Sequence, residues 1–175
     1  MKLLVVGGTS GLGQAIVEKY NADHISSSTG FSIPEKITEA IAHSLDYSIV
    51  INCLPDSNQN KLLWPMYAAH NELGLKTYFI TVGSMSWRFN EPLHSKRALF
   101  DWNESILLKP STTRHTLLNP AHLWNSNKDS PVEHITPKEI LDTIDFLIKH
   151  SYTSASVISL IEIKGQVKCL SLIHI

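Results

Sequence analysis

Short apolar runs alternate along the chain with longer segments in which apolar residues recur every three or four positions. The first run, Lys2–Val6, has four successive apolar residues and precedes a glycine, a pattern typical of a strand that is buried on both faces. Helical spacing follows directly in Gln14–Asn21. Such alternation predicts β-α-β units and therefore a largely parallel sheet.

The same two patterns predict the remaining elements. Thr136 precedes Pro137 and stands three residues before Glu139, which is the spacing of a helix capping box. Pro65 is expected near the start of one helix and Gly74 just after its end. The last two strands, separated by a lysine and a glycine, are expected to form either a hairpin or a last sheet strand with a short tail. Strands are predicted at His24–Ser27, Ser48–Leu54, Lys76–Val82, Arg114–Leu118, Val157–Ile163 and Val167–Ile175, and helices at Pro34–Leu45, Leu62–Leu73, Ser95–Leu108 and Thr136–His150.

Composition favours one packed domain over residues 1–175. Hydrophobic residues make up 43% of the chain and charged residues 18%, which argues against disorder. The 15 basic and 16 acidic side chains leave a net charge of −1, so electrostatics give no reason to expect nucleic acid or an anionic membrane as a partner. A small molecule is the expected ligand.

Cysteine usage and the length of the apolar runs bear on location. Cys53 and Cys169 both lie in apolar runs, where an unpaired thiol behaves as a small hydrophobic side chain. No apolar run approaches the ~18 residues of a membrane-spanning helix, and Leu3–Val6 is too short for a signal peptide. We therefore expect a cytoplasmic protein without a membrane segment.

Glycine is the first indication of chemistry, because four of the eight glycines fall between positions 7 and 13. A glycine-rich turn between a strand and a helix lets the backbone approach a pyrophosphate, whose charge is then stabilised by the start of the helix. The P-loop of nucleotide hydrolases would need a lysine and a hydroxyl after Gly13, where Gln14 and Ala15 stand instead. Dinucleotide binding is the favoured interpretation, and the alternative is a turn that only packs the helix against the strand.

The spacing G-x-x-x-G-x-G resembles that of the short-chain dehydrogenase/reductase family. Further motifs resemble the family in the right order: Ile49–Pro55 its fourth-strand motif, Thr81–Ser84 the end of its fifth strand, Ser95–Leu99 the surroundings of its lysine, and Asn119–Asn125 its N-P-G-x-V-x-T loop. The resemblance spans most of the chain, although only the first motif is specific. It implies an α/β fold, Rossmann-like, with a doubly wound parallel sheet and helices on both faces.

The resemblance also implies which residues bind a dinucleotide. An acid at the end of the second strand would bond the ribose of NAD and repel the 2′-phosphate of NADP. Serines and no acid stand there, so NADP(H) is favoured over NAD(H). The implied cofactor-binding residues are Gly7, Thr9, Ser10, Gly11, Leu12 and Gly13 in the glycine loop, Ser27 and Ser28 after the second strand, Asn52, Cys53 and Leu54 in the fourth-strand motif, and Pro120, Leu123 and Asn125 in the later loop.

The same resemblance implies catalytic roles for Ser84, which would polarise a substrate carbonyl, and for Lys96. The family also uses a tyrosine four residues before the lysine as its proton donor. Pro92 occupies that position, and no tyrosine occurs between positions 78 and 152. Two interpretations follow: either another group such as His94 donates the proton, or the site performs no carbonyl chemistry.

Three functions are therefore compatible with the sequence. The first is an NAD(P)-dependent oxidoreductase of the short-chain type that acts on a small carbonyl or alcohol. The alternative is a catalytically inactive NAD(P)-binding protein, a cofactor sensor or assembly subunit, and the third is a cofactor-assisted isomerase or lyase. The nine scattered histidines lack the spacing of zinc ligands, so no metal is expected.

Two further expectations concern assembly and size. The apolar strand predicted at Val167–Ile175 is an edge that a second copy could cover in a homo-oligomer. Family members commonly have about 250 residues, a length that one domain allows. The 175 residues of this chain therefore predict that the substrate-covering and catalytic parts are trimmed.

Overall fold

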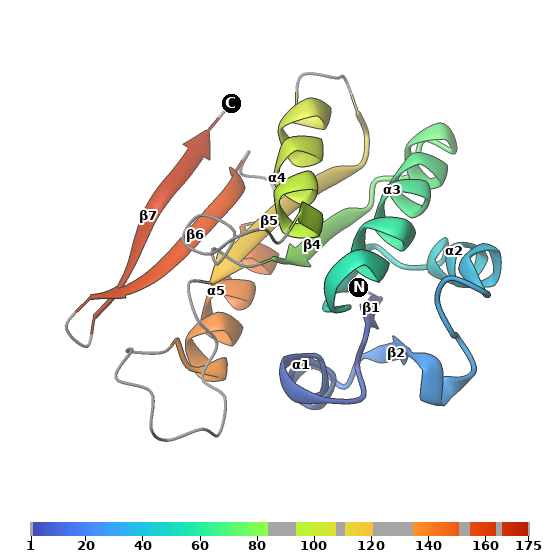
Figure 1. Cartoon of the computed structure of the whole chain (residues 1–175), viewed down its shortest axis with the longest axis horizontal. Helices are drawn as coiled ribbons and strands as arrows, with labels where there is room; N and C mark the ends of the chain where they lie inside the picture. The colour runs from blue at the N-terminus through green and yellow to red at the C-terminus, as the bar shows by residue number, and fades with distance from the viewer. Residues whose placement is uncertain are drawn as a thin grey trace.

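Seven strands form one sheet in the computed structural model, which describes residues 2–83, 94–107, 111–120, 135–150, 155–163 and 166–174. At positions 56, 57, 94–96, 100 and 107 and in the last two ranges the description covers the backbone only. The spatial order is β2-β1-β3-β4-β5-β6-β7, and every neighbouring pair is parallel except β6 and β7 (Figure 1). The strands are β1 (Leu3–Val6), β2 (Asp23–Ile25), β3 (Ile49–Asn52), β4 (Tyr78–Val82), β5 (Arg114–Pro120), β6 (Ala155–Ile163) and β7 (Gln166–His174).

Helices cover both faces of this sheet, which confirms the expected doubly wound α/β fold (Figure 1). Helices α1 (Gly11–Tyr20) and α5 (Pro137–Lys149) pack on one face. Helices α2 (Ile37–Ser44), α3 (Asp56–Glu72) and α4 (His94–Leu107) pack on the other. A short 3-10 turn, η1 (Ser27–Thr29), follows β2.

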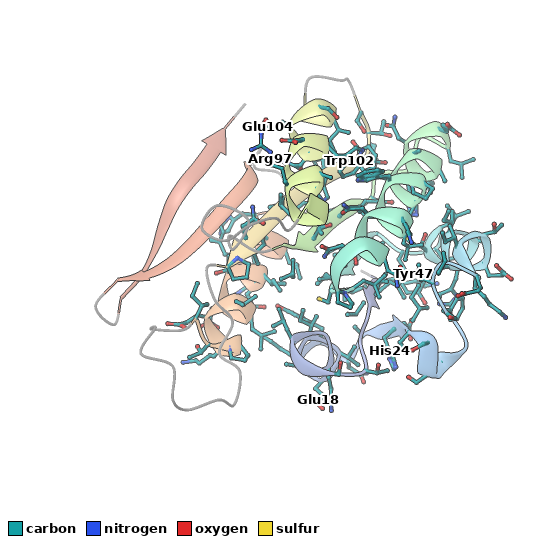
Figure 2. The ribbon with its side chains drawn as sticks, viewed as in Figure 1. Glu18, His24, Tyr47, Arg97, Trp102 and Glu104 are labelled. Atoms are coloured by element: carbon teal, nitrogen blue, oxygen red, sulfur yellow. The ribbon has the colours of Figure 1, made fainter. Side chains whose placement is uncertain are left out.

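Aromatic rings join α3 to α4. The ring of Trp102 on α4 stacks on Trp64 at 6.2 Å and meets Tyr67 edge-on at 5.4 Å (Figure 2). It also meets the ring of His115 on β5 at 5.2 Å. Edge-to-face and offset-stacked rings at these distances are favourable beyond the area that they bury. Trp102 therefore acts in packing between α3, α4 and β5.

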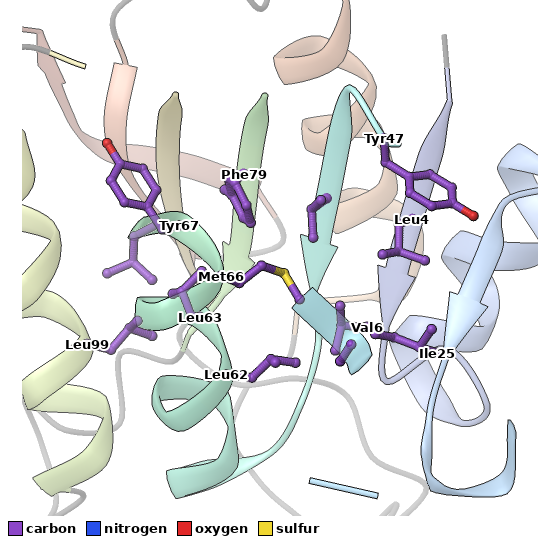
Figure 3. Packing of buried hydrophobic residues seen from close by; sticks show 13 residues of the cluster. Leu4, Val6, Ile25, Tyr47, Leu62, Leu63, Met66, Tyr67, Phe79 and Leu99 are labelled. Carbon is purple, nitrogen blue, oxygen red and sulfur yellow. The ribbon is translucent and has the colours of Figure 1, made fainter. Parts of the chain in front are cut away.

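Successive residues of each central strand enter opposite cores, since side chains alternate across a sheet. Leu3 and Val5 pack toward α1 and α5, whereas Leu4 and Val6 pack toward α2 and α3. Figure 3 shows the second core, in which Leu62, Leu63 and Met66 of α3 approach the strands. Every residue of β1, β3 and β4 is buried, and this two-sided burial explains their continuous apolar runs.

Helix α3 begins six residues earlier than the sequence predicts. Its N-cap is Pro55, and Pro65 lies inside the helix, so the expectation that Pro65 marks the helix start is wrong. An internal proline removes one helical hydrogen bond. Pro65 and Lys61, whose carbonyl group loses that bond, are both exposed, so water can replace the missing donor.

Helix α5 is capped as predicted. Thr136 Oγ1 accepts from the backbone N–H of Glu139, whose carboxylate accepts from the N–H of Thr136 at 2.8 Å. The helix is tied to α1 by Asp145, which accepts from Tyr20 Oη and Lys19 Nζ, both at 2.5 Å. Among the described residues, no helix is long and apolar enough to cross a membrane.

Candidate dinucleotide site

The carboxyl ends of the parallel strands meet at one edge of the sheet. Val6 lies opposite Asn52 and Asn52 opposite Thr81, so the residues that follow these strands are neighbours in space. The helix after β1 packs on one face of the sheet and the helix after β3 on the other. A doubly wound sheet binds its ligand at this kind of switch point, here between β1 and β3.

The glycine loop is held by contacts that exclude side chains. A Cβ atom on Gly13 would lie 2.1 Å from the carbonyl oxygen of Gly7, and one on Gly8 would lie 2.6 Å from the Cβ of His24 (Figure 2). Gly7 has φ +83°, and a Cβ atom built on Gly7 would lie 3.2 Å from the peptide group between Cys53 and Leu54. Three of the glycines therefore pack the loop against its surroundings.

Gly11 differs from the other three. Its φ is +53°, and a Cβ atom built on it would have no neighbour within 4 Å among the described residues. A positive φ favours glycine, and open space beside the loop leaves room for a ligand to approach the backbone. Packing alone does not account for a glycine at this position.

The start of α1 can receive an anion. Ser10 is its N-cap and makes no side-chain capping bond within the described part of the chain, and the first turn contains no acidic residue. The first N–H groups of a helix have no partner inside the helix and form the positive end of its dipole. They lie beside the glycine loop because α1 begins at Gly11. This arrangement suits a phosphate group.

Hydroxyl groups follow β2 at the same edge. Ser26 is buried and its Oγ lies 2.9 Å from the Oγ of Ser28, whereas the side chains of Ser27 and Ser28 are exposed. The backbone N–H of Gly7 donates to Ile25 at 2.9 Å, so this turn lies next to the glycine loop. Asp23 lies at the opposite end of β2, where it accepts from Tyr47 Oη at 3.0 Å.

Asn52 is buried and its amide is used within the protein. Its Oδ1 accepts from the backbone N–H of Leu54 at 3.1 Å, and its Nδ2 donates to the carbonyl oxygen of Gln59 at 3.3 Å. These bonds shape the turn that places Cys53 and Leu54 against Gly7. Gln59 is itself fully buried, and sequence reasoning missed it.

The ends of β4 and β5 pack as closely against each other as the glycine loop packs against its neighbours. A Cβ atom on Gly83 would lie 2.2 Å from Asn119 Oδ1, and Asn119 is buried. The N–H of Gly83 donates to the carbonyl oxygen of Leu118 at 2.8 Å. Pro120, predicted to face the cofactor, is buried at the end of β5.

A buried histidine ties α4 to these strands. His115 Nδ1 lies 2.5 Å from Asn103 Oδ1, and its Nε2 lies 2.8 Å from Thr81 Oγ1. Because an amide oxygen only accepts, Nδ1 donates and the hydroxyl of Thr81 donates to Nε2. Burial lowers the pKa of His115 to about 3, so its ring is neutral at pH 7.

The predicted catalytic residues are placed only in part. His94 and Lys96 lie at the start of α4, where only their backbone is described, and Ser84, Leu123 and Asn125 lie outside the described residues. Position 96 precedes the buried Leu99 by three residues and Asn103 by seven, which puts it on the same face of the helix as both.

Several solved structures are similar to this chain in fold. A short-chain dehydrogenase from Burkholderia cenocepacia in complex with NADP is similar over 91% of this chain and 89% of its own, with a TM-score of 0.69 and 15% identity. A short-chain dehydrogenase from Bacillus anthracis is similar over 94% and 95%, with a TM-score of 0.69 and 12% identity. This chain has the fold of the short-chain dehydrogenases.

The fold does not by itself select a reaction. A UDP-N-acetylglucosamine 4-epimerase from Bacillus cereus is also similar, over 97% of this chain and 78% of its own, with a TM-score of 0.64 and 16% identity. No protein-family model matches the chain, and no curated protein matches its sequence.

The two dehydrogenase comparisons extend along about nine-tenths or more of this chain and of each matched chain. The expectation that the catalytic and substrate-covering parts are trimmed stays a prediction, because residues 84–93 and 121–134 lie outside the described part of the chain.

Proposed function

We propose that the chain binds NADP(H) and acts as an NAD(P)-dependent oxidoreductase of the short-chain type on a small carbonyl or alcohol in the cytoplasm. The observation that carries the proposal is the glycine loop at the β1/β3 switch point, with Gly11 open beside it and the start of α1 free of acidic residues. A structural neighbour that is in complex with NADP supports the choice of ligand.

The described residues fit a dinucleotide at this edge. The backbone N–H groups at the start of α1 would receive the pyrophosphate, since no carboxylate in the first turn competes for them. The exposed hydroxyls of Ser27 and Ser28 would bond the 2′-phosphate, which an acid would repel. Asn52 would act indirectly, by holding Cys53 and Leu54 against the loop.

The bound dinucleotide supplies a hydride for the carbonyl carbon, and the protein must place a proton on the carbonyl oxygen. In this proposal Ser84 donates a hydrogen bond to that oxygen. Lys96 holds the nicotinamide ribose, and His94 gives up the proton in place of the tyrosine.

Binding gives the first test. We expect NADPH at about one hundred times its Kd to raise the free energy of unfolding by about 2.7 kcal/mol, which thermal unfolding measures as an increase in Tm. Ser27→Asp should weaken NADPH at least tenfold and NADH less, because only NADPH carries the 2′-phosphate. Ser48→Asp, an exposed serine at the opposite edge of the sheet, is the matched control. Calorimetry without heat for either cofactor contradicts the proposal.

Turnover gives the second test. With NADPH and a panel of small carbonyl compounds, we expect Ser84→Ala and Lys96→Ala each to lower kcat/KM by roughly 10²-fold, the scale on which a lost oxyanion donor acts. Lys76→Ala, an exposed lysine at the amino end of β4, should leave kcat/KM unchanged. Equal turnover in all variants would show that the catalytic residues are misassigned.

The alternative is an NAD(P)-binding protein without catalysis. It is favoured by one feature, the proline at the position of the family's tyrosine. Its signature is NADPH binding in the first experiment together with no NADPH oxidation by any carbonyl in the second. Oxidation that depends on Lys96 excludes it.

A further inference from the structure

The side chain of Gln59 joins the ends of two strands. It lies near the start of α3, is fully buried, and donates from Nε2 to the carbonyl oxygen of Val82 at 2.8 Å. The same Nε2 lies 3.4 Å from the carbonyl oxygen of Asn52, while Asn52 Nδ2 donates back to the carbonyl oxygen of Gln59. Gln59 therefore contacts the last residue of β3 and the last residue of β4.

The carbonyl group of Val82 needs such a donor. β3 ends at Asn52, which lies opposite Thr81, so the β3 ladder does not extend to Val82. A buried carbonyl without a partner is costly, and native proteins supply a donor from a side chain where the backbone does not. Gln59 is that donor at the point where the two strands separate.

Both the C=O and the N–H of the peptide group between Val82 and Gly83 are consequently hydrogen-bonded. Its oxygen accepts from Gln59, and its N–H donates to Leu118 of β5 at 2.8 Å. Asn119 packs against the Cα of Gly83 so closely that no side chain fits there. One orientation of this peptide satisfies all three contacts, and the next residue in the sequence is Ser84.

We infer that Gln59 is a positioning residue: the bond between its buried amide and the carbonyl group of Val82 fixes the peptide group between Val82 and Gly83, which directly precedes Ser84 in the sequence. The inference rests on the proposed function, in which Ser84 bonds the substrate carbonyl. Asn52, which holds Cys53 and Leu54 against the glycine loop, bonds the backbone carbonyl group of Gln59, and a change of the Gln59 side chain keeps that group. We therefore expect loss of the Gln59 amide to affect the catalytic step more than dinucleotide affinity.

The experiment compares two neighbouring amides. Gln59→Met keeps the length of the side chain and removes the donor, and Asn58→Leu removes a similar donor, the Nδ2 that bonds the carbonyl oxygen of Ile33 at 3.3 Å. In Gln59→Met we expect the amide proton of Gly83 to exchange at least about tenfold faster, kcat to fall roughly 10–100-fold, and the Kd of NADPH to stay within about twofold. Asn58→Leu should change none of the three.

A measurement on the unaltered protein does not depend on any variant folding. The side-chain amide protons of the buried Gln59 should exchange roughly a hundred times more slowly than those of the exposed Gln14, because exchange requires opening of the buried contact. Equal exchange overturns the inference. An exchange rate of the Gly83 amide proton that is unchanged in Gln59→Met also overturns the inference. A faster exchange of this proton with an unchanged kcat overturns it as well.

The inference and the proposed function fail in different ways. An unaltered protein that reduces no carbonyl compound contradicts the proposed function. The exchange of Gly83 in Gln59→Met then decides by itself whether Gln59 orients the end of β4.

Discussion

Between pH 7 and pH 5 we expect the free energy of unfolding to fall by about 4 kcal/mol, because two buried histidines stay neutral in the folded chain. Burial lowers the pKa of His70 to about 4 and that of His115 to about 3. His70 is bonded to Ser44 and Thr77, and His115 to Asn103 and Thr81, so both rings accept and donate within the protein. A typical domain is stable by only 5–15 kcal/mol, so this loss is large.

The sign of this pH effect on stability follows from the number of protons that the folded and unfolded states bind. Both rings have an ordinary pKa of 6.5 when unfolded. Below pH 6.5 the unfolded state therefore binds protons that the folded state does not, and stability falls with pH until the folded pKa values are reached. Each ring contributes about 2 kcal/mol at pH 5, since one pKa unit corresponds to about 1.4 kcal/mol. The lowered pKa of Asp145 affects stability only at a more acidic pH, below its ordinary value of 3.8.

Urea unfolding at pH 7, 6 and 5 measures the effect. His115→Asn keeps an amide donor near the position of Nδ1, and His70→Asn can place its amide oxygen there as an acceptor for the Thr77 hydroxyl. Each variant lowers stability at pH 7 by about 1–2 kcal/mol through the bond that is lost. Each should halve the change between pH 7 and pH 5, and the double variant should nearly remove it. His43→Asn, at an exposed position, should retain the full change. An undiminished change in the double variant would show that other groups cause the acid sensitivity.

The hydrophobic pattern predicted the sheet and its helices because strands that are buried on both faces consist of continuous apolar runs. β1, β3 and β4 are buried at every position and appear as apolar runs, and the capping box of α5 lies where Thr136 and Glu139 predicted it. The start of α3 was missed because its first turns are polar. Tertiary contacts of that turn with the strand ends replace the apolar stripe that the prediction requires.

Gln59 shows what kind of site residue sequence reasoning misses. It precedes Leu63 by four residues and Met66 by seven, so it occupies the buried face of α3 at a position where an apolar residue is expected. A polar residue on such a face is the available signal, but the sequence does not show which buried carbonyl it bonds. That partner, Val82, depends on where β3 ends beside β4.

The glycine loop could be predicted as a site, whereas the separate role of each glycine could not. Spacing alone treats Gly7, Gly8, Gly11 and Gly13 alike. The structure separates three that are packed against neighbouring atoms from Gly11, whose Cβ position has no neighbour in the part of the chain that the structure describes. Those distances predict different consequences for substitutions that look equivalent in the sequence.

Gly13→Ala should therefore lower stability by about 2 kcal/mol and weaken NADPH binding at least tenfold. Helix propensity alone predicts the opposite sign, since alanine in place of glycine stabilises a helix by about 1 kcal/mol. The added Cβ atom would lie 2.1 Å from the carbonyl oxygen of Gly7, more than an ångström inside the ordinary contact distance of 3.4 Å. Overpacking of this kind costs about 1–3 kcal/mol. The loop has little room to retreat, because even a Cβ atom built on Gly7 would lie only 3.2 Å from the peptide between Cys53 and Leu54.

The matched control is Gly74→Ala after the end of α3. Gly74 has φ +67°, and no atom of the described residues lies within 4 Å of its Cβ position, so alanine there costs about 1–2 kcal/mol of backbone strain. Both variants should be less stable in urea, but only Gly13→Ala should lose affinity for NADPH in calorimetry. Retained affinity in Gly13→Ala would mean that the loop tolerates displacement and that its close packing against α1 does not shape the dinucleotide site. Loss of affinity in both variants would assign the effect to global stability, because Gly74 lies at the end of α3 remote from the glycine loop.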